Sequence, residues 1–170
     1  MKNSRATAIG SPIQLDYSAI SFLIVDDQPF SRHIIRSMLA GFGSRELYES
    51  ANGSEALELA HNAMPGIIIT DLMMPDSNGM KLIAKLKAPE SRVRQIPIIV
   101  LSGYLTRTGA LSIINSGADE FLVKPVSPKA LHEHIARVLL RKGKAGKSSG
   151  QGQPDHIGAG GKPGEQAAYI

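Results

Sequence analysis

The sequence contains no cysteine, no apolar run long enough to cross a membrane, and no secretory signal pattern in its first 18 residues. Without cysteine, the chain can form neither disulfide bonds nor zinc or iron–sulfur sites with thiolate ligands. A membrane-spanning helix needs about 20 consecutive apolar residues, and a signal peptide needs an apolar core before a small-residue cleavage site. We therefore expect a cytoplasmic protein without a membrane partner, and its 42% of hydrophobic residues suffices for a core.

Net charge is also missing from the centre of the chain, although the whole carries a formal charge of +4. Residues 19–140 hold 12 Lys and Arg against 12 Asp and Glu. The excess of positive charge lies in residues 141–170, with five basic and two acidic side chains, and in the first 18 residues. Because nucleic-acid-binding domains normally present a basic surface, we expect no nucleic-acid partner for the central part.

Both ends of the chain differ in composition from the centre. The last 30 residues hold eight of the 17 glycines, and such a segment cannot bury enough apolar surface to offset its ordering entropy. We predict a flexible leader over residues 1–18, one domain over 19–141 and a disordered, Gly-rich basic tail over 142–170. The tail is interpreted as a solvated linker, with weak docking to acidic partners, nucleic acid or anionic lipid as the alternative.

Between the two ends, short apolar runs alternate with segments of helical period. Nearly continuous β-branched runs predict strands buried on both faces, and two weaker runs predict strands nearer the sheet edges. The strong candidates are residues 20–25, 66–71 and 96–101, and the weaker ones are 46–50 and 120–123. Pro29 and Pro128 are typical of the first turn of a helix. Five such units predict an open, doubly wound α/β domain with a parallel sheet.

Polar side chains stand where the predicted strands end. Asp26 and Asp27 follow the first strand, Asp71 ends the third, and Ser102 and Lys124 follow the fourth and fifth. The carboxyl ends of parallel strands share one sheet edge, where ligands bind. Two carboxylates 4 Å apart repel by about 4 kcal/mol at an effective dielectric constant near 20, so the cluster requires a cation, a bound proton or a strong structural reason. Carboxylates suit Mg²⁺ and lysine suits phosphoryl oxygens, which predicts phosphoryl transfer to a carboxylate.

These residues, together with Pro75, Gly79 and the run from Phe121 to Pro125, resemble the signature set of bacterial response-regulator receiver domains. The resemblance covers about residues 20–140. It implies a flavodoxin-like (βα)5 fold with a five-stranded parallel sheet and a cis peptide bond before Pro125. It also implies a stand-alone, chemotaxis-type regulator in a two-component phosphorelay. Its partners would be a histidine kinase or histidine phosphotransfer protein and a downstream target protein, and the chain would be a monomer or weak dimer.

The resemblance gives the acidic residues and the lysine defined roles. Asp71 would be the phosphoacceptor. Asp26, Asp27, Asp71 and the backbone carbonyl of Met73 would bind Mg²⁺ as the cofactor, and Lys124 would pair with the phosphoryl group. The protein would not be an enzyme beyond phosphorylating and dephosphorylating itself.

A second set of residues would carry the switch. Ser102 would move to bond the phosphoryl group and Phe121 would turn inward behind it, which would change the surface of the fourth helix, fifth strand and fifth helix. Gly103 and Tyr104 would modulate the site. We hypothesise that the bulk of Met73 and Tyr104 slows loss of the phosphate.

Two other functions are left open by the sequence. A Mg²⁺-dependent phosphohydrolase of the haloacid-dehalogenase group also uses an Asp nucleophile, although its D-x-D pattern does not fit Asp26-Asp27-Gln28. A DNA-binding regulator could instead act through the basic tail. Hydrolysis of small phosphoesters would favour the first, and salt-dependent binding to duplex DNA would favour the second.

Overall fold

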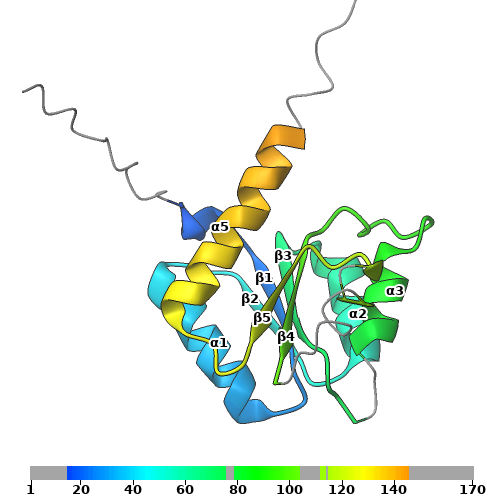
Figure 1. Ribbon diagram of the computed structural model, residues 1–170, viewed down its shortest axis with the longest axis horizontal. Coiled ribbons are helices and arrows are strands. Elements are labelled where there is room, and N and C mark those ends of the chain that lie inside the picture. The colour runs from blue at the N-terminus through cyan, green and yellow to red at the C-terminus, as the bar shows by residue number, and fades with distance from the viewer. Residues whose placement is uncertain (1–14, 76–78, 104–111, 114, 146–170) are drawn as a thin grey trace, which may run out of the picture.

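The computed structural model describes residues 15–75, 79–103, 112–113 and 115–145 (Figure 1). Five parallel strands form one sheet in the order β2-β1-β3-β4-β5. In chain order the described elements are a 3-10 helix η1 (Tyr17–Ala19), β1 (Phe22–Val25), α1 (Pro29–Phe42), β2 (Leu47–Ser50), α2 (Gly53–Ala63), β3 (Ile67–Asp71), α3 (Gly79–Lys87), β4 (Ile98–Ser102), β5 (Glu120–Val123) and α5 (Pro128–Ala145). The predicted doubly wound α/β fold is confirmed. Of the fourth helix, expected around Leu111 and Ile114, these two residues lie outside the described ranges, whereas residues 112, 113 and 115 are described and helical.

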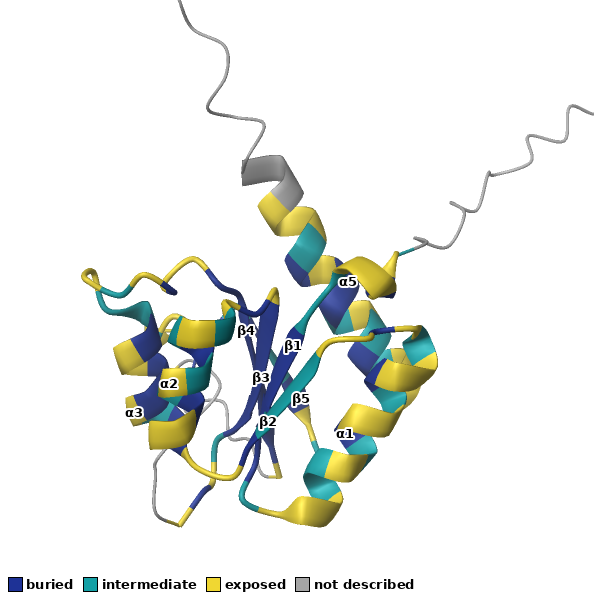
Figure 2. Cartoon of the chain, turned by 180° about the vertical axis from the view of Figure 1, so that it is seen from behind, coloured by how far each residue is buried: buried dark blue, intermediate teal, exposed yellow. Residues whose placement is uncertain are grey.

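The helices cover both faces of the sheet, with α1 and α5 on one face and α2 and α3 on the other (Figures 1 and 2). Alternate strand residues face opposite layers. Phe22 and Ile24 join the apolar cluster under α1 and α5, and Leu23 and Val25 join the cluster under α2 and α3. Every residue of β1, β3 and β4 is buried, which explains why these strands read as continuous apolar runs.

The strands predicted as weaker candidates occupy the two edges of the sheet, as expected. β2 is half-buried over most of its length, and in β5 buried residues alternate with the half-buried Phe121 and the exposed Val123. Helix α1 begins with Pro29 in its first turn and ends at Gly43, whose φ of 106° is left-handed. The Lys124–Pro125 peptide bond is cis, also as expected.

The domain begins earlier and its last helix ends later than the composition suggested. Tyr17, which lies in the segment expected to be a flexible leader, is 4% exposed. Its ring lies 5.0 Å from that of Phe42, and its hydroxyl is 2.8 Å from Nδ1 of His132 on α5. Residues 15–18 therefore belong to the fold, and α5 continues to Ala145, beyond the expected boundary at residue 141. The rest of the leader and tail lies outside the described residues.

Burial raises the pKa of Tyr17 to about 12, so its hydroxyl stays protonated at neutral pH and can donate to His132. None of the helices within the described ranges is long and apolar enough to cross a membrane.

Candidate functional site

The carboxyl edge of the sheet brings together the side chains that follow the strands. Asp26 directly follows β1, Asp71 is the last residue of β3, and Lys124 directly follows β5. Strands β1, β3, β4 and β5 are consecutive neighbours in the sheet, so these strand ends share one edge. The register of the parallel strands aligns their carboxyl ends, because Val25 pairs with Thr70 and Asp71 pairs with Leu101. The side chains of Asp26, Asp71 and Lys124 therefore start from neighbouring points of a buried backbone.

Lys124 lies between two buried carboxylates. Its Nζ atom is 2.8 Å from Oδ2 of Asp26 and 2.7 Å from Oδ2 of Asp71. Asp26 is 1% exposed and Asp71 is 4% exposed. Burial lowers the pKa of Lys124, but the hydrogen bonds and charges of Asp26 and Asp71 outweigh burial and leave that pKa raised. The lysine is therefore a permanent cation at neutral pH.

Both oxygens of Asp26 accept hydrogen bonds from the chain. Oδ1 accepts from the backbone N–H of Gln28 at 2.9 Å, and Oδ2 accepts from the hydroxyl of Ser31 at 2.5 Å and from Lys124. In Asp71, Oδ1 accepts from the N–H of Met73 at 3.1 Å and Oδ2 accepts from Lys124. Asp26 is therefore a fixed anchor of the cluster, and a cation that binds its Oδ2 atom must compete with Lys124.

Asp27 supplies the oxygen that fits a metal ion. Its Oδ1 atom is buried and has no hydrogen-bond partner among the described residues. Carboxylate oxygens of Asp26, Asp27 and Asp71, one from each, lie within 4.8 Å of one another. Mg²⁺ binds through one or two carboxylates together with water and phosphate oxygens. An orphaned buried carboxylate oxygen beside two further carboxylates fits such an ion.

An open cavity of about 610 Å³ borders Asp71 and Lys124. Its wall is largely apolar and includes Phe30 and Ile34 of α1 and Met73 after β3. Phe30 and Met73 are 77% and 73% exposed, the most exposed large hydrophobic side chains in the described ranges. The acidic site therefore opens beside an apolar surface rather than directly into a polar one.

Comparison with known proteins identifies the family. The family model for the response regulator receiver domain matches residues 22–136. The chemotaxis protein CheY1 of Helicobacter pylori is 34% identical over 121 residues, which are 71% of this chain and 97% of that protein. The chain belongs to the response regulator receiver domain family.

Other matches agree with this assignment. The receiver domain is 35% identical over 127 residues to the probable transcriptional regulator ycf27 of Guillardia theta, which covers 75% of this chain and 48% of that protein. The crystal structure of the chemotaxis response regulator CheY4 of Vibrio cholerae aligns with a TM-score of 0.65 at 29% identity, covering 70% of this chain and 98% of that one. Two-component signalling through phosphorylation with magnesium is a general feature of the family.

The structure places the expected switch residues of the receiver at the β4 and β5 strands. Ser102 ends β4 and is fully buried, and its carbonyl accepts from the N–H of Lys124 at 2.8 Å. Phe121, in β5, is partly buried and packs against the cluster under α2 and α3. Gly103 lines the cavity, with no described atom within 4 Å of the place where a Cβ would stand. Tyr104 lies outside the described residues.

Gly79 stands against the backbone of the proposed phosphoacceptor. A Cβ at this position would lie 2.5 Å from the carbonyl oxygen of Asp71 and 2.9 Å from Cα of Leu72. Both contacts are with backbone, which cannot rotate away as a side chain can. The glycine of the sequence pattern therefore lets α3 begin directly behind Asp71.

We expect Gly79→Ala to lower the free energy of unfolding by about 2 kcal/mol, because the added methyl group forces the Asp71 backbone to shift. Gly41→Ala is the matched control. Gly41 lies in α1 with no atom within 4 Å of a Cβ, so alanine should raise stability by about 0.5 kcal/mol through helix propensity. Urea unfolding of both variants checks this, and equal effects from the two substitutions would contradict it.

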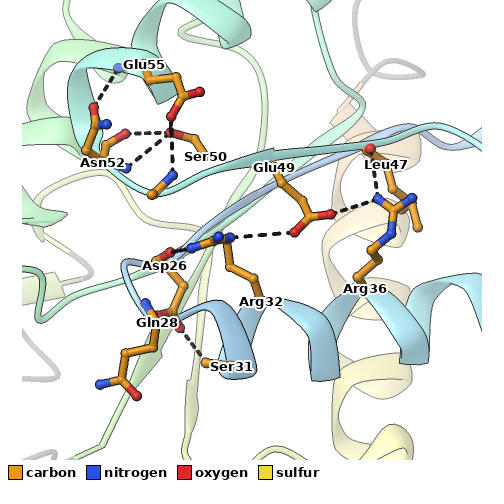
Figure 3. A network of polar contacts seen from close by, with 11 residues as sticks. Asp26, Gln28, Ser31, Arg32, Arg36, Leu47, Glu49, Ser50, Asn52 and Glu55 are labelled. Carbon is orange, nitrogen blue, oxygen red and sulfur yellow. Dashed lines mark hydrogen bonds and ion pairs between the residues drawn. The ribbon is translucent and has the colours of Figure 1, made fainter.

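Several residues that hold the acidic site were not found from the sequence. Ser31 contacts the Asp26 carboxylate, and Nη1 of Arg32 donates to the Asp26 carbonyl at 2.6 Å (Figure 3). Both lie in the first turns of α1, five and six residues after Asp26. A single serine or arginine at the start of a helix has no distinguishing pattern, so only the geometry reveals the contact.

Proposed function

We propose that this receiver domain is a phosphorylation switch in a two-component phosphorelay and that Asp71 is its phosphoacceptor. The observation that carries the proposal is the position of Lys124 between Asp26 and Asp71, beside an orphaned oxygen of Asp27. A fixed cation and a candidate divalent-cation site beside one carboxylate suit the addition of a phosphoryl group to that carboxylate.

In the proposed reaction an oxygen of Asp71 attacks the phosphorus of a phosphohistidine on the donor protein. A new P–O bond forms, the P–N bond breaks, and its electron pair returns to the imidazole nitrogen, giving an acyl phosphate and a free histidine. Lys124 is placed to pair with the added negative charge of the phosphoryl group, because its Nζ atom already contacts Oδ2 of Asp71 at 2.7 Å. Mg²⁺, held by Asp26, Asp27, Asp71 and the Met73 carbonyl, would neutralise charge on the phosphoryl oxygens.

The apolar cavity wall supports a protein as the phosphoryl donor. Phe30 and Met73 are exposed within reach of the same cavity that Asp71 lines. Exposed apolar side chains beside a polar centre are typical of protein-binding surfaces. We propose that a histidine kinase or histidine phosphotransfer protein docks here, with its phosphohistidine directed at Asp71.

The output would pass through β5 and α5 to a target protein. Phe121 is flanked in β5 by Glu120, which is tied to α5 through His134 at 2.9 Å and Arg141 at 2.8 Å. A shift of Phe121 would therefore be carried to α5 by neighbouring ion pairs. Of the fourth helix of the expected output surface, the structure describes residues 112, 113 and 115.

Titration of the full chain with beryllofluoride and Mg²⁺, followed by amide NMR, tests this proposal. We expect saturable shifts that begin at Asp71 and extend to Ser102, Phe121 and α5, because the mimic adds the charge that the switch detects. Mg²⁺ alone is the control and should shift only the residues around its proposed ligands Asp26, Asp27, Asp71 and Met73. Spectra unchanged by beryllofluoride would show that the domain is not a phosphorylation switch.

A further inference from the structure

The peptide that carries the two adjacent aspartates is held from outside the acidic site. The N–H of Asp26 donates to the carbonyl of Ser50 at the end of β2, at 3.2 Å. The carbonyl of Asp26 accepts from Nη1 of Arg32 at 2.6 Å (Figure 3). That carbonyl belongs to the peptide bond joining Asp26 to Asp27. Arg32 therefore fixes the backbone from which the Asp27 side chain starts.

Arg32 is in turn held by Glu49 on β2. Nε of Arg32 lies 3.5 Å from Oε2 of Glu49, and the Arg32 side chain is 17% exposed. Nε has no hydrogen-bond partner among the described residues, so the contact with Glu49 is an ion pair without hydrogen-bond geometry. The other oxygen of Glu49 binds Nη1 of Arg36 at 3.0 Å. Glu49 thus stands between two arginines of α1.

The charge of Arg32 has a consequence for a neighbouring cation. A guanidinium cannot lose its proton at any ordinary pH. Placed against the backbone of Asp26, an uncompensated guanidinium would oppose the binding of Mg²⁺ to the aspartates. Glu49 supplies the compensating negative charge from the side of Arg32 that faces β2. The arginine can then act as a rigid hydrogen-bond donor at little electrostatic cost to the metal site.

We propose that Arg32 and Glu49 are a pair of positioning residues that sets the affinity of the acidic site for Mg²⁺. Arg32 orients the Asp26–Asp27 peptide, and Glu49 both aligns Arg32 and cancels its charge. The inference rests on the proposed function, because it concerns the metal that the phosphorylation reaction uses. Neither residue touches the reacting groups.

The test compares wild type with Arg32→Lys, Glu49→Gln and the control Arg36→Lys, each as the full, unphosphorylated chain. Mg²⁺ dissociation constants are measured by amide NMR titration, and thermal unfolding is measured without Mg²⁺. Arg32→Lys should weaken Mg²⁺ binding about tenfold, the size typical of groups that orient metal ligands, because lysine keeps the charge but loses the planar fork. Glu49→Gln should weaken it several-fold. Arg36→Lys should leave it within about twofold, because Arg36 contacts Glu49 and the Leu47 carbonyl but not Asp26.

The outcomes separate a positioning role from a structural one. Dissociation constants for Arg32→Lys and Glu49→Gln close to that of wild type would overturn the inference, even if both variants unfold at lower temperature. Should Arg32→Lys fail to fold, Glu49→Gln decides alone. If all variants bind Mg²⁺ equally and still accept phosphate from a small-molecule donor, the inference fails and the proposed function stands. If wild type takes up no phosphate, the proposed function fails whatever the dissociation constants are.

Discussion

Replacing Asp71 by asparagine is expected to abolish phosphorylation of the domain by small phosphodonors. The amide oxygen of asparagine cannot form an acyl phosphate, while the size and shape of the side chain are kept. The amide oxygen can still accept one of the hydrogen bonds that Met73 and Lys124 now donate to Asp71, so we expect the variant to fold. Intact-protein mass spectrometry after incubation with acetyl phosphate and Mg²⁺ measures the outcome directly.

Asp119→Asn is the matched control for this experiment. Asp119 directly precedes β5 and, like Asp71, pairs with a lysine, since its Oδ2 atom lies 3.1 Å from Nζ of Lys87. Its carboxylate accepts from the N–H of Ile98 at the amino end of β4, whereas Asp71 lies at the carboxyl end of β3. We expect Asp119→Asn to gain a phosphoryl group as wild type does. Phosphorylation of Asp71→Asn at the wild-type rate would show that another residue is the phosphoacceptor, and Asp27 would be the first candidate.

Lys124→Met is expected to slow phosphorylation about 100-fold, as removal of one preorganised donor to a developing charge commonly does. The same variant should bind Mg²⁺ more tightly than wild type. Lys124 is a cation that contacts Asp26 and Asp71 directly, so it competes with any metal for the same oxygens. Initial rates with acetyl phosphate and NMR titration with Mg²⁺ measure the two effects. Weaker Mg²⁺ binding by Lys124→Met would contradict the competition.

Removing Lys124 should also lower the free energy of unfolding by about 3 kcal/mol without Mg²⁺, because two buried carboxylates lose their cation. The raised pKa of Lys124 fixes the pH dependence of this difference. The lysine is charged in both folded and unfolded chains below its ordinary pKa of 10.5, so its contribution is full there and is lost only as pH rises through the higher folded value. The difference should therefore be constant from about pH 7 to pH 9.

The control for stability is Lys129→Met. Lys129 is 87% exposed and pairs loosely with Glu133 at 4.0 Å on the outside of α5. Its loss should change the free energy of unfolding by less than about 0.5 kcal/mol. Urea unfolding of both variants with and without Mg²⁺ completes the comparison. Mg²⁺ should restore the free energy of unfolding of Lys124→Met, and it should affect Lys129→Met as it affects wild type.

The sequence was enough to place the acidic site because strand ends are determined by the pattern of buried residues. β1, β3 and β4 are buried on both faces, so their apolar runs mark where each strand stops and which polar residue comes next. Once the strands are parallel, Asp26, Asp71 and Lys124 must share an edge. This part of the site follows from local patterns and a general property of parallel sheets.

The outer support of the site could not be predicted in the same way. Glu49 reaches Arg32 because β2 pairs with β1 in a register that sets Ile24 opposite Glu49. That register depends on the loop between α1 and β2 and on packing of the whole layer, neither of which appears as a periodic signal. Tyr17 was assigned to a flexible leader from composition for a related reason. Its partners Phe42 and His132 lie far away in the sequence, and only the folded chain brings them together.

The attachment of Tyr17 makes α5 the point at which both ends of the domain are fastened. The chain enters through Tyr17, which is hydrogen-bonded to His132 near the start of α5 and packs against Phe42 with its ring tilted, and it leaves through the far end of the same helix. Tension or crowding applied to the leader is therefore transmitted to α5 through Tyr17, as well as to β1, whose first residue Phe22 stacks on the same ring. A fusion partner or expression tag placed before residue 15 would exert force on the same helix that a signalling partner is proposed to bind.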